Sequence, residues 1–202
     1  MGTLEKYKLA VVGCGGIGSY LAEHLFILYS NNQLNSIESI TLFDDDVVDT
    51  KNLKYQNFED LDITDYKSDS LATRYSFLNR VERVTNPETL NDYDIIIAAV
   101  DNSQFRKLLY DWAATKKDKY WIDLRSEGRS IAYYTKNKIN TLDKMYNTLV
   151  ETSEEGTSCQ LNFELEAGII QQGNKIIATI GSQLLLNKLR GEYSSAEFRA
   201  RI

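Results

Sequence analysis

Two kinds of apolar block run along the chain, and they have the lengths of strands and of helices. The segment 94–100 is apolar after its first residue, and such an unalternated run of strand length is typical of a parallel strand covered on both faces. In the segment 16–30, Ile17, Leu21, Leu25 and Leu28 recur at helical spacing. The pattern predicts strands at 8–12, 39–43, 81–85, 94–100, 120–124 and 130–134, and helices at 16–30, 66–78, 105–114 and 175–189.

This alternation of strands and helices predicts an α/β fold, with a Rossmann-like, doubly wound and mostly parallel sheet that carries helices on both faces. The 202 residues, 43% of them hydrophobic, suit one domain. From residue 141 the pattern changes to helix and polar loop. We expect the polar segment 151–159 to be a mobile surface loop.

A glycine-rich turn joins the first strand to the first helix. Gly13, Gly15 and Gly18 have the G-x-G-x-x-G spacing, which permits a tight turn, a close backbone approach to phosphate and tight packing of helix on strand. A phosphate at this turn lies at the helix N-terminus, where backbone N–H groups are unpaired. The turn serves NAD, FAD and ATP alike, and a turn that merely packs is the alternative.

Polar residues follow two of the predicted parallel strands. Asp44 and Asp46 come after the strand at 39–43, and Asp101 and Asn102 come after the run at 94–100. Because ligands of open parallel sheets bind outside the carboxyl ends of the strands, we expect these residues to converge on the glycine turn. The alternatives are a solvated turn at Asp44–Asp46 and a helix cap at Asp101.

In this order, the residues resemble the signature of the ThiF/MoeB adenylyltransferases and ubiquitin-activating enzymes. The resemblance rests on Gly13, Gly15, Gly16, Gly18, Asp44, Asp46, Asn52, Leu53, Gln56, Lys67, Asp101, Asn102 and Arg106. It covers about residues 8–135 and implies one domain over 1–202, with a nucleotide-binding core at 1–135 that the tail 136–202 completes. It also implies ATP- and Mg²⁺-dependent adenylation of the C-terminal carboxylate of a ubiquitin-like or sulfur-carrier protein by a homodimer.

The resemblance also implies roles for single residues. Gly15 and Gly16 would let the backbone approach the phosphates, Asp44 would hold the ribose, and Asn52 and Lys67 would hold the phosphates. Asp101 would bind magnesium, as an oxygen ligand suited to a hard cation. The remaining expected nucleotide-site residues are Gly13, Gly18, Asp46, Gln56 and Asn102. For Lys67 the alternative is a surface lysine near a helix start.

The two cysteines have different expected roles. Cys159 lies roughly where the resemblance places the thioester-forming or persulfide-related cysteine, so one hypothesis is that it accepts the activated acyl group. An unreactive, half-buried thiol is the alternative. Cys14, inside the glycine turn, is expected to pack rather than to react. Two cysteines exclude a disulfide framework and a cysteine-only zinc site.

The chain departs from the family pattern at Tyr55, where the family carries an arginine. Tyrosine cannot neutralise phosphate charge, so Lys54, Arg74 or Arg125 would have to stand in. Arg125 is also expected either to bind the incoming carboxylate or a phosphate, or to form an ion pair with Asp123 or Glu127. A catalytically impaired binding or scaffold subunit is therefore the second hypothesis. An NAD(P)-dependent oxidoreductase is a third, although it has no need for Asn52 or Asp101.

Charge and hydropathy narrow the class of partner. The net charge is −6 and the basic residues are scattered, which argues against a nucleic-acid partner. The longest apolar runs have strand length and the first residues lack the apolar core of a signal peptide, so we expect a soluble, cytoplasmic protein without a membrane segment.

Overall fold

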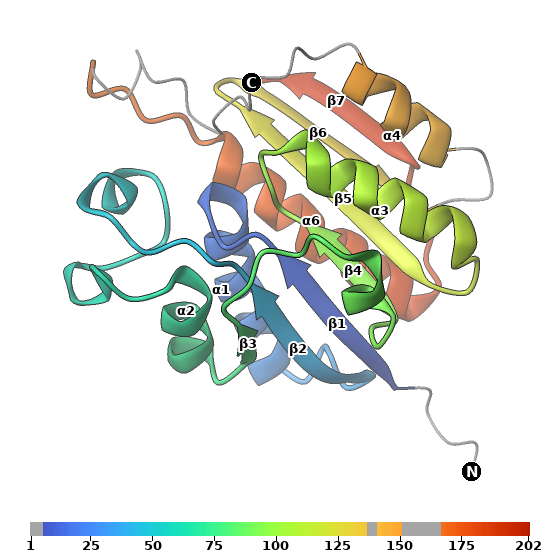
Figure 1. The fold of residues 1–202 in the computed structure, drawn as a ribbon, viewed down its shortest axis with the longest axis horizontal. Coiled ribbons are helices and arrows are strands. Elements are labelled where there is room, and N and C mark those ends of the chain that lie inside the picture. Colours follow the sequence, from blue (N-terminus) through green and yellow to red (C-terminus); the bar gives the residue numbers. More distant parts are fainter. Residues whose placement is uncertain (1–5, 137–140, 151–166) are drawn as a thin grey trace.

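A seven-stranded sheet organises the computed structural model, which describes residues 6–136, 141–150 and 167–202. The strand order is β3-β2-β1-β4-β5-β6-β7 (Figure 1). The strands are β1 (Tyr7–Val12), β2 (Ile37–Phe43), β3 (Leu78–Arg80), β4 (Ile95–Ala98), β5 (Tyr120–Glu127), β6 (Ser130–Thr135) and β7 (Glu197–Arg201). The helices are α1 (Gly16–Ser30), α2 (Lys67–Tyr75), α3 (Ser103–Thr115), α4 (Thr141–Val150) and α6 (Gly173–Arg190). Short 3₁₀ turns are η1 (Thr50–Lys54), η2 (Asp60–Asp62) and η3 (Pro87–Leu90).

The first five strands of the chain are parallel, and β6 and β7 add an antiparallel edge. Val12 at the end of β1 pairs with Phe43 of β2 and with Ala98 of β4, so the carboxyl ends of these three strands are level. The strand order reverses direction between β1 and β4, and a crevice at such a switch point is where open α/β sheets bind ligands.

Two hydrophobic layers cover the sheet, as the doubly wound prediction requires. Leu9 and Val11 of β1 point into a core shared with α1, α2 and α6, whereas Ala10 and Val12 point into a core shared with α3 and α4. This alternation follows from the two-residue period of a strand. Figure 1 shows α3 and α4 in front of the sheet, with α1 and α6 behind it. The fold prediction is confirmed.

The edges of the sheet differ from the prediction. The helix predicted at 66–78 ends at Tyr75, because Ser76 takes a left-handed conformation with φ of 57°. The chain then enters β3 at once, so the strand predicted at 81–85 lies instead at Leu78–Arg80. The helix predicted at 175–189 starts earlier, at Gly173.

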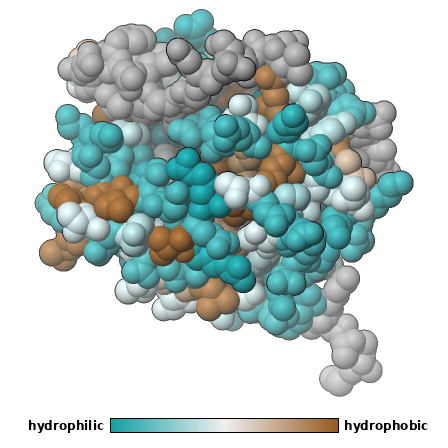
Figure 2. Space-filling model, in the orientation of Figure 1, coloured by the Kyte–Doolittle hydropathy of each residue, from teal (hydrophilic) through white to brown (hydrophobic). Residues whose placement is uncertain are grey.

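The edge strand β7 was not predicted. Its five residues, Glu197–Arg201, are mostly exposed and three of them are charged, so they carry no apolar pattern. The strand pairs through its backbone with β6 and extends the sheet, and its few apolar side chains add local contacts, such as Phe198 stacked on Tyr133. Figure 2 shows hydrophilic residues over most of the face seen in Figure 1, broken by separate hydrophobic groups. Within the described ranges, no helix has the length and apolarity needed to cross a bilayer.

Candidate nucleotide-binding site

A pocket of about 730 Å³ lies at the carboxyl ends of β1, β2 and β4. Its volume is in the range of small-molecule and cofactor sites. The glycine turn, the segment after β2, η1 and the starts of α2 and α3 all contribute to its wall. The pocket brings together Gly13, Gly15, Gly16, Asp44, Asp46, Asn52, Gln56, Lys67, Asp101 and Asn102. Gly18 and Arg125, which the sequence also suggested for the site, do not line it.

The glycines of the turn have separate physical tasks. Gly13 has φ of +95°, and a Cβ there would lie 2.7 Å from the carbonyl oxygen of Ala99. A Cβ on Gly18 would lie 1.8 Å from the carbonyl oxygen of Gly13, so Gly18 is needed for close packing. Around Gly15 there is space, since the nearest atom, Gln56 Nε2, would be 4.0 Å away. Gly15 therefore leaves the pocket wall open to a ligand.

The N-terminus of α1 opens at this wall without a side-chain cap. Gly15 is the N-cap residue and provides no capping hydrogen bond, and the first turn contains no acidic residue. The first N–H groups of a helix lack intrahelical partners, and they attract anions together with the helix dipole. The turn can therefore bind phosphate oxygens through its backbone.

Asp44 connects the end of β2 to the glycine turn. Its Oδ2 accepts a hydrogen bond of 2.6 Å from the Cys14 amide, and its Oδ1 accepts one of 2.8 Å from the Asp46 amide. Burial raises the pKa of Asp44, while these two backbone hydrogen bonds act in the opposite direction. Asp44 is thus a partly buried, hydrogen-bonded carboxylate whose position at the pocket is fixed by the backbone.

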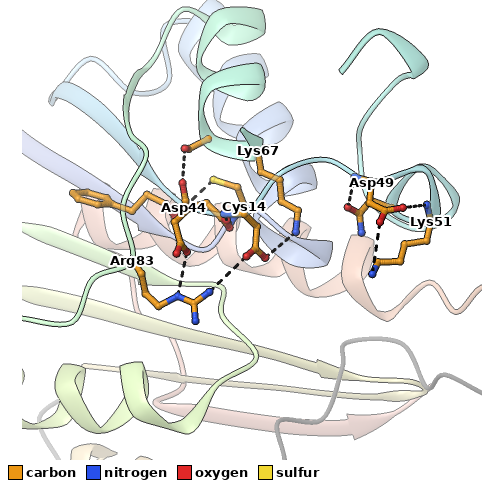
Figure 3. Close-up of polar contacts among 11 residues, drawn as sticks. Cys14, Asp44, Asp49, Lys51, Lys67 and Arg83 are labelled. Carbon is orange, nitrogen blue, oxygen red and sulfur yellow. Dashed lines mark hydrogen bonds and ion pairs between the residues drawn. The ribbon is translucent and has the colours of Figure 1, made fainter. Parts of the chain in front are cut away.

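Lys67 and Arg83 meet at the carboxylate of Asp46 (Figure 3). Lys67 Nζ lies 3.0 Å from Asp46 Oδ2, and Arg83 Nη2 lies 3.5 Å from Asp46 Oδ1. Arg83 Nε also donates to Asp45 at 3.1 Å. The Lys67 side chain is 9% exposed, so the alternative of a surface lysine does not hold. Sequence reasoning missed Arg83, because an arginine three residues beyond a short edge strand matches no motif.

The 3₁₀ turn η1 is held by two side chains. Asn52 Oδ1 accepts from the Asp49 amide at 2.9 Å, and Asp49 Oδ1 accepts from the Lys51 amide at 3.1 Å (Figure 3). This reciprocal capping fixes the turn on one side of the pocket. Tyr55, which follows η1, also lines the pocket, where it contributes a phenol rather than a charge.

Asp101 and Asn102, which follow β4, have different roles. Asn102 caps α3, because its Oδ1 accepts a hydrogen bond of 2.8 Å from the Phe105 amide. The cap expected as an alternative for Asp101 thus belongs to its neighbour. Asp101 is exposed at the pocket, and no hydrogen bond or ion pair with the described part of the chain engages its carboxylate. It has the lone pairs that a hard cation prefers.

The arginines proposed to replace the charge missing at Tyr55 are engaged elsewhere. Arg74 forms an ion pair with Asp62 and donates to the carbonyl oxygen of Asn57 at 3.0 Å. Arg125 Nη2 lies 2.6 Å from the buried Asp123, so the ion-pair alternative for Arg125 is the one observed. Neither arginine lines the pocket, and nor does Lys54. The basic lining residues are Lys51, Lys67, Arg83 and Lys107.

The acidic segment after β2 also has the donor spacing of a metal site, since ligand oxygens of Asp44, Asp45 and Asp46 lie within 4.8 Å of one another. These carboxylates, however, already accept the backbone hydrogen bonds and the ion pairs described above. Asp101 is therefore the better candidate for a magnesium ligand.

Cys14 is fully buried beneath the turn. Burial raises the pKa of its thiol well above the usual value, and the nearby Asp44 carboxylate adds to the effect. The expectation of a packing cysteine is confirmed. Cys159 and the segment 151–159 lie outside the described residues.

A model of the ThiF family matches residues 1–201. The chain belongs to the ThiF family. No curated protein sequence matches it significantly. Among solved structures, PaaA has a TM-score of 0.67 at 16% identity, with 98% of this chain and 62% of that chain covered.

Several solved structures of Escherichia coli MccB are similar to this chain. Its complex with ATP gives a TM-score of 0.64 at 17% identity, covering 98% of this chain and 61% of MccB. Its complex with AMPCPP and MccA gives a TM-score of 0.63 at 16% identity, covering 96% of this chain and 58% of MccB. The chain thus spans about three fifths of the length of these structural neighbours, and at this identity the likeness concerns the fold.

Proposed function

We propose that the chain is an ATP-dependent adenylyltransferase that activates the C-terminal carboxylate of a small protein or peptide. One observation carries the proposal: the uncapped N-terminus of α1 opens into the pocket that also contains Asp44, Lys67 and Asp101. Membership of the ThiF family and the MccB complexes with ATP and with MccA support it. The substrate class follows from the resemblance, with a ubiquitin-like or sulfur-carrier protein as the first candidate.

In this proposal different pocket residues bind different parts of the nucleotide. Asp44 accepts hydrogen bonds from the ribose hydroxyls with the lone pairs that the backbone leaves free. The amides of Gly15 and Gly16, with Asn52, Gln56 and Lys67, hold the phosphates. Lys67 would exchange its partner Asp46, 3.0 Å away in the free chain, for a phosphate oxygen. Arg83 keeps its ion pairs with Asp45 and Asp46, and its charge reduces the repulsion between these two carboxylates and the phosphates.

Magnesium fits the residues present. Among the described residues that line the pocket, acidic side chains outnumber basic ones: Asp44, Asp45, Asp46, Asp49, Glu82, Asp101 and Asp111 against Lys51, Lys67, Arg83 and Lys107. A free triphosphate would be repelled, whereas a metal complex carries less charge. Asp101 would hold the ion directly or through water. When bound, magnesium supplies charge neutralisation on the leaving pyrophosphate.

The chemical step needs orientation and charge stabilisation rather than a proton acceptor. A carboxylate oxygen of the acyl substrate attacks the α-phosphorus and forms a new P–O bond. The bond from that phosphorus to the oxygen bridging the α- and β-phosphates breaks, and its electron pair leaves with pyrophosphate. The carboxylate is already ionised at neutral pH. Lys67 and the amides of the glycine turn stabilise charge on the phosphoryl oxygens.

Further steps belong to the same proposal and rest on the resemblance. They are transfer of the acyl group to Cys159, assembly as a homodimer and a cytoplasmic location. A catalytically impaired binding or scaffold subunit is the second candidate, and Tyr55 favours it because a phenol at the pocket cannot neutralise a phosphate.

Calorimetry with nucleotides tests the proposal. Mg·ATP should bind at micromolar to millimolar concentration, EDTA should weaken binding strongly, and NAD should not bind. Asp101→Asn should remove the magnesium dependence, whereas Lys144→Met, at a distant ion pair with Glu197, should leave it intact. Pyrophosphate exchange with a panel of peptides ending in Gly-Gly separates an enzyme from a scaffold. Absence of ATP binding at millimolar nucleotide contradicts the proposed function.

A further inference from the structure

The amide of Asn174 is buried and has no hydrogen-bond partner within the described part of the chain. The residue is 1% exposed, and both its Nδ2 and its Oδ1 are unpaired. Buried polar groups in proteins are almost always hydrogen-bonded, because an unpaired one loses its solvation without compensation. An amide with both donor and acceptor unused therefore calls for a missing partner.

Asn174 lies where two helices begin side by side. Its Nδ2 would be 2.4 Å from a Cβ on Gly16, the first residue of α1, and Asn174 itself is in the first turn of α6. Further along, Thr179 contacts His24 at 3.1 Å and Arg190 donates to Gln33 at 2.9 Å. The two helices thus run in the same direction, and both N-termini open at the carboxyl edge of the sheet.

Neither helix start has a side-chain cap. The N-cap residues are Gly15 for α1 and Gln172 for α6, and neither provides a capping hydrogen bond. Two uncapped N-termini side by side create a region of positive potential, which suits an anion. Asn174, between them, is a second and independent sign of a ligand at this place.

Two further buried polar atoms without a partner among the described residues lie near the two helix starts, one beside each. Gln56 Oε1 is buried and unpaired on the pocket side, and Nε2 of the same side chain would lie 4.0 Å from a Cβ on Gly15. Ser126 Oγ is buried and unpaired at the end of β5, and a Cβ on Gly173 would lie 2.7 Å from it. Gly16 and Gln56 line the nucleotide pocket, whereas Asn174 and Ser126 do not. The unpaired groups thus extend from the pocket toward β5.

The chemistry of these groups distinguishes between two anionic ligands. A phosphate accepts hydrogen bonds but cannot donate one when ionised, so it would leave Asn174 Oδ1 unpaired. The last residue of a peptide carries a carboxylate, which accepts, and a backbone N–H, which donates. An asparagine amide offers the complementary donor and acceptor. The buried groups therefore match a peptide C-terminus better than a phosphate.

We propose that Asn174, assisted by Ser126, is the positioning residue for the C-terminal residue of the acyl substrate; this inference rests on the proposed function. Asn174 Nδ2 donates to the substrate carboxylate and its Oδ1 accepts from the last peptide N–H. The carboxylate is thereby placed beside Gly16, next to the α-phosphate bound at the glycine turn. Asn174 lies directly after Gly173 and two residues beyond the exposed Gln172, and a change of its side-chain rotamer is the motion required.

Two nonreacting adenylate analogues provide the test. 5′-O-sulfamoyladenosine carries no acyl group, and its N-(glycylglycyl) derivative carries a peptide C-terminus joined as in the acyl adenylate. Calorimetry on the full chain gives the affinity gained from the peptide part. In wild type this gain should be at least tenfold. Asn174→Leu should reduce this gain about tenfold, because both hydrogen bonds of the Asn174 amide to the peptide part are lost, while the affinity for sulfamoyladenosine stays within twofold.

The controls separate positioning from structure. Asn187→Leu makes the same substitution near the other end of α6 and should leave the gain unchanged. Asn174→Leu should melt at or above the wild-type temperature, because an unpaired buried amide is removed, and Asn174→Ala repeats the test should Leu not fit. The inference is overturned if Asn174→Leu keeps the affinity gain that the glycylglycyl group provides, whatever its melting temperature. It is also overturned if the variant loses the same affinity for both analogues. Failure of wild type to bind either analogue contradicts the proposed function itself.

Discussion

Arg106 of α3 and the fully buried Asp123 of β5 form an ion pair with 3.2 Å between Nε and Oδ1. The same guanidinium donates at 2.6 Å to the carbonyl oxygen of Val100, the residue before Asp101. Arg125 completes the neutralisation of Asp123 from the other side. The turn that carries Asp101 is therefore fastened to the centre of the sheet by Arg106.

Arg106→Leu should loosen that turn. We expect the free energy of unfolding to fall by about 3 kcal/mol, the usual cost of removing one partner of a buried pair, since Arg125 keeps Asp123 partly compensated. Affinity for Mg·ATP should fall as well, because Asp101 loses its fixed position. Urea denaturation and calorimetry measure the two effects. Lys119→Leu removes a partly exposed ion pair with Asp94 at the opposite end of β5 and should cost about 1 kcal/mol, well below the cost of Arg106→Leu. Unchanged nucleotide affinity in Arg106→Leu would show that Asp101 does not depend on this pair.

Lys67→Met tests the cation at the start of α2. Its partner Asp46 is 54% exposed and also contacts Arg83, so stability should change by less than about 1 kcal/mol. Affinity for Mg·ATP should fall about 10- to 100-fold, the value of one or two charge-assisted hydrogen bonds. Titration calorimetry gives the affinity and thermal unfolding the stability. A large loss of stability with no loss of affinity would assign Lys67 to the fold alone.

Acid should weaken the segment between β2 and α2 through Asp62. Burial alone would raise the pKa of Asp62. The pKa nevertheless lies below its usual value, because the carboxylate accepts hydrogen bonds from Ser70 and from the Glu59 amide and lies beside the charge of Arg74. A carboxyl whose pKa is lower in the folded state stabilises that state above its unfolded pKa of about 3.9 and loses this contribution as the pH falls toward the folded value.

Asp62→Asn should therefore be less stable than wild type at pH 7, and the difference should shrink below about pH 4. Urea denaturation over this pH range measures it. Asp60→Asn changes an exposed residue of the same 3₁₀ turn and should have little effect at pH 7. A difference between Asp62→Asn and wild type that stays constant with pH would exclude the ion pair as its cause.

The parts of the site that follow from the sequence are those with a fixed local spacing. The glycine turn lies between a strand and a helix, and Asp44 and Asp101 directly follow strands, so their convergence was predictable from the sheet. Arg83 meets Asp45 across 38 positions of the chain, and Asn174 reaches Gly16 from a helix that no motif connects to it. Such pairs depend on how helices and loops pack across the sheet. The charged edge strand β7 lacks an apolar pattern, and it is held by backbone pairing with β6 and by contacts between residues far apart in the chain, such as Phe198 stacked on Tyr133.

Two glycines of the turn allow one matched comparison. Gly18→Ala should destabilise the chain by about 3 kcal/mol, because its Cβ would overlap the carbonyl oxygen of Gly13 at 1.8 Å. Gly15→Ala should cost about 1 kcal/mol, the ordinary loss at an N-cap, since the nearest atom is 4.0 Å away and the added methyl group overlaps nothing.

For nucleotide affinity the order of the two variants should be the opposite of their order for stability, with the larger loss in Gly15→Ala. The methyl group of Gly15→Ala lies at the pocket wall, where it would keep a phosphate from the first amides of α1, so affinity for Mg·ATP should fall at least tenfold. The folded fraction of Gly18→Ala, measured at low temperature, should bind with nearly wild-type affinity, because Gly18 does not line the pocket. Thermal unfolding and calorimetry on the same samples give both quantities. If Gly15→Ala binds as wild type does, the phosphates do not lie at this turn.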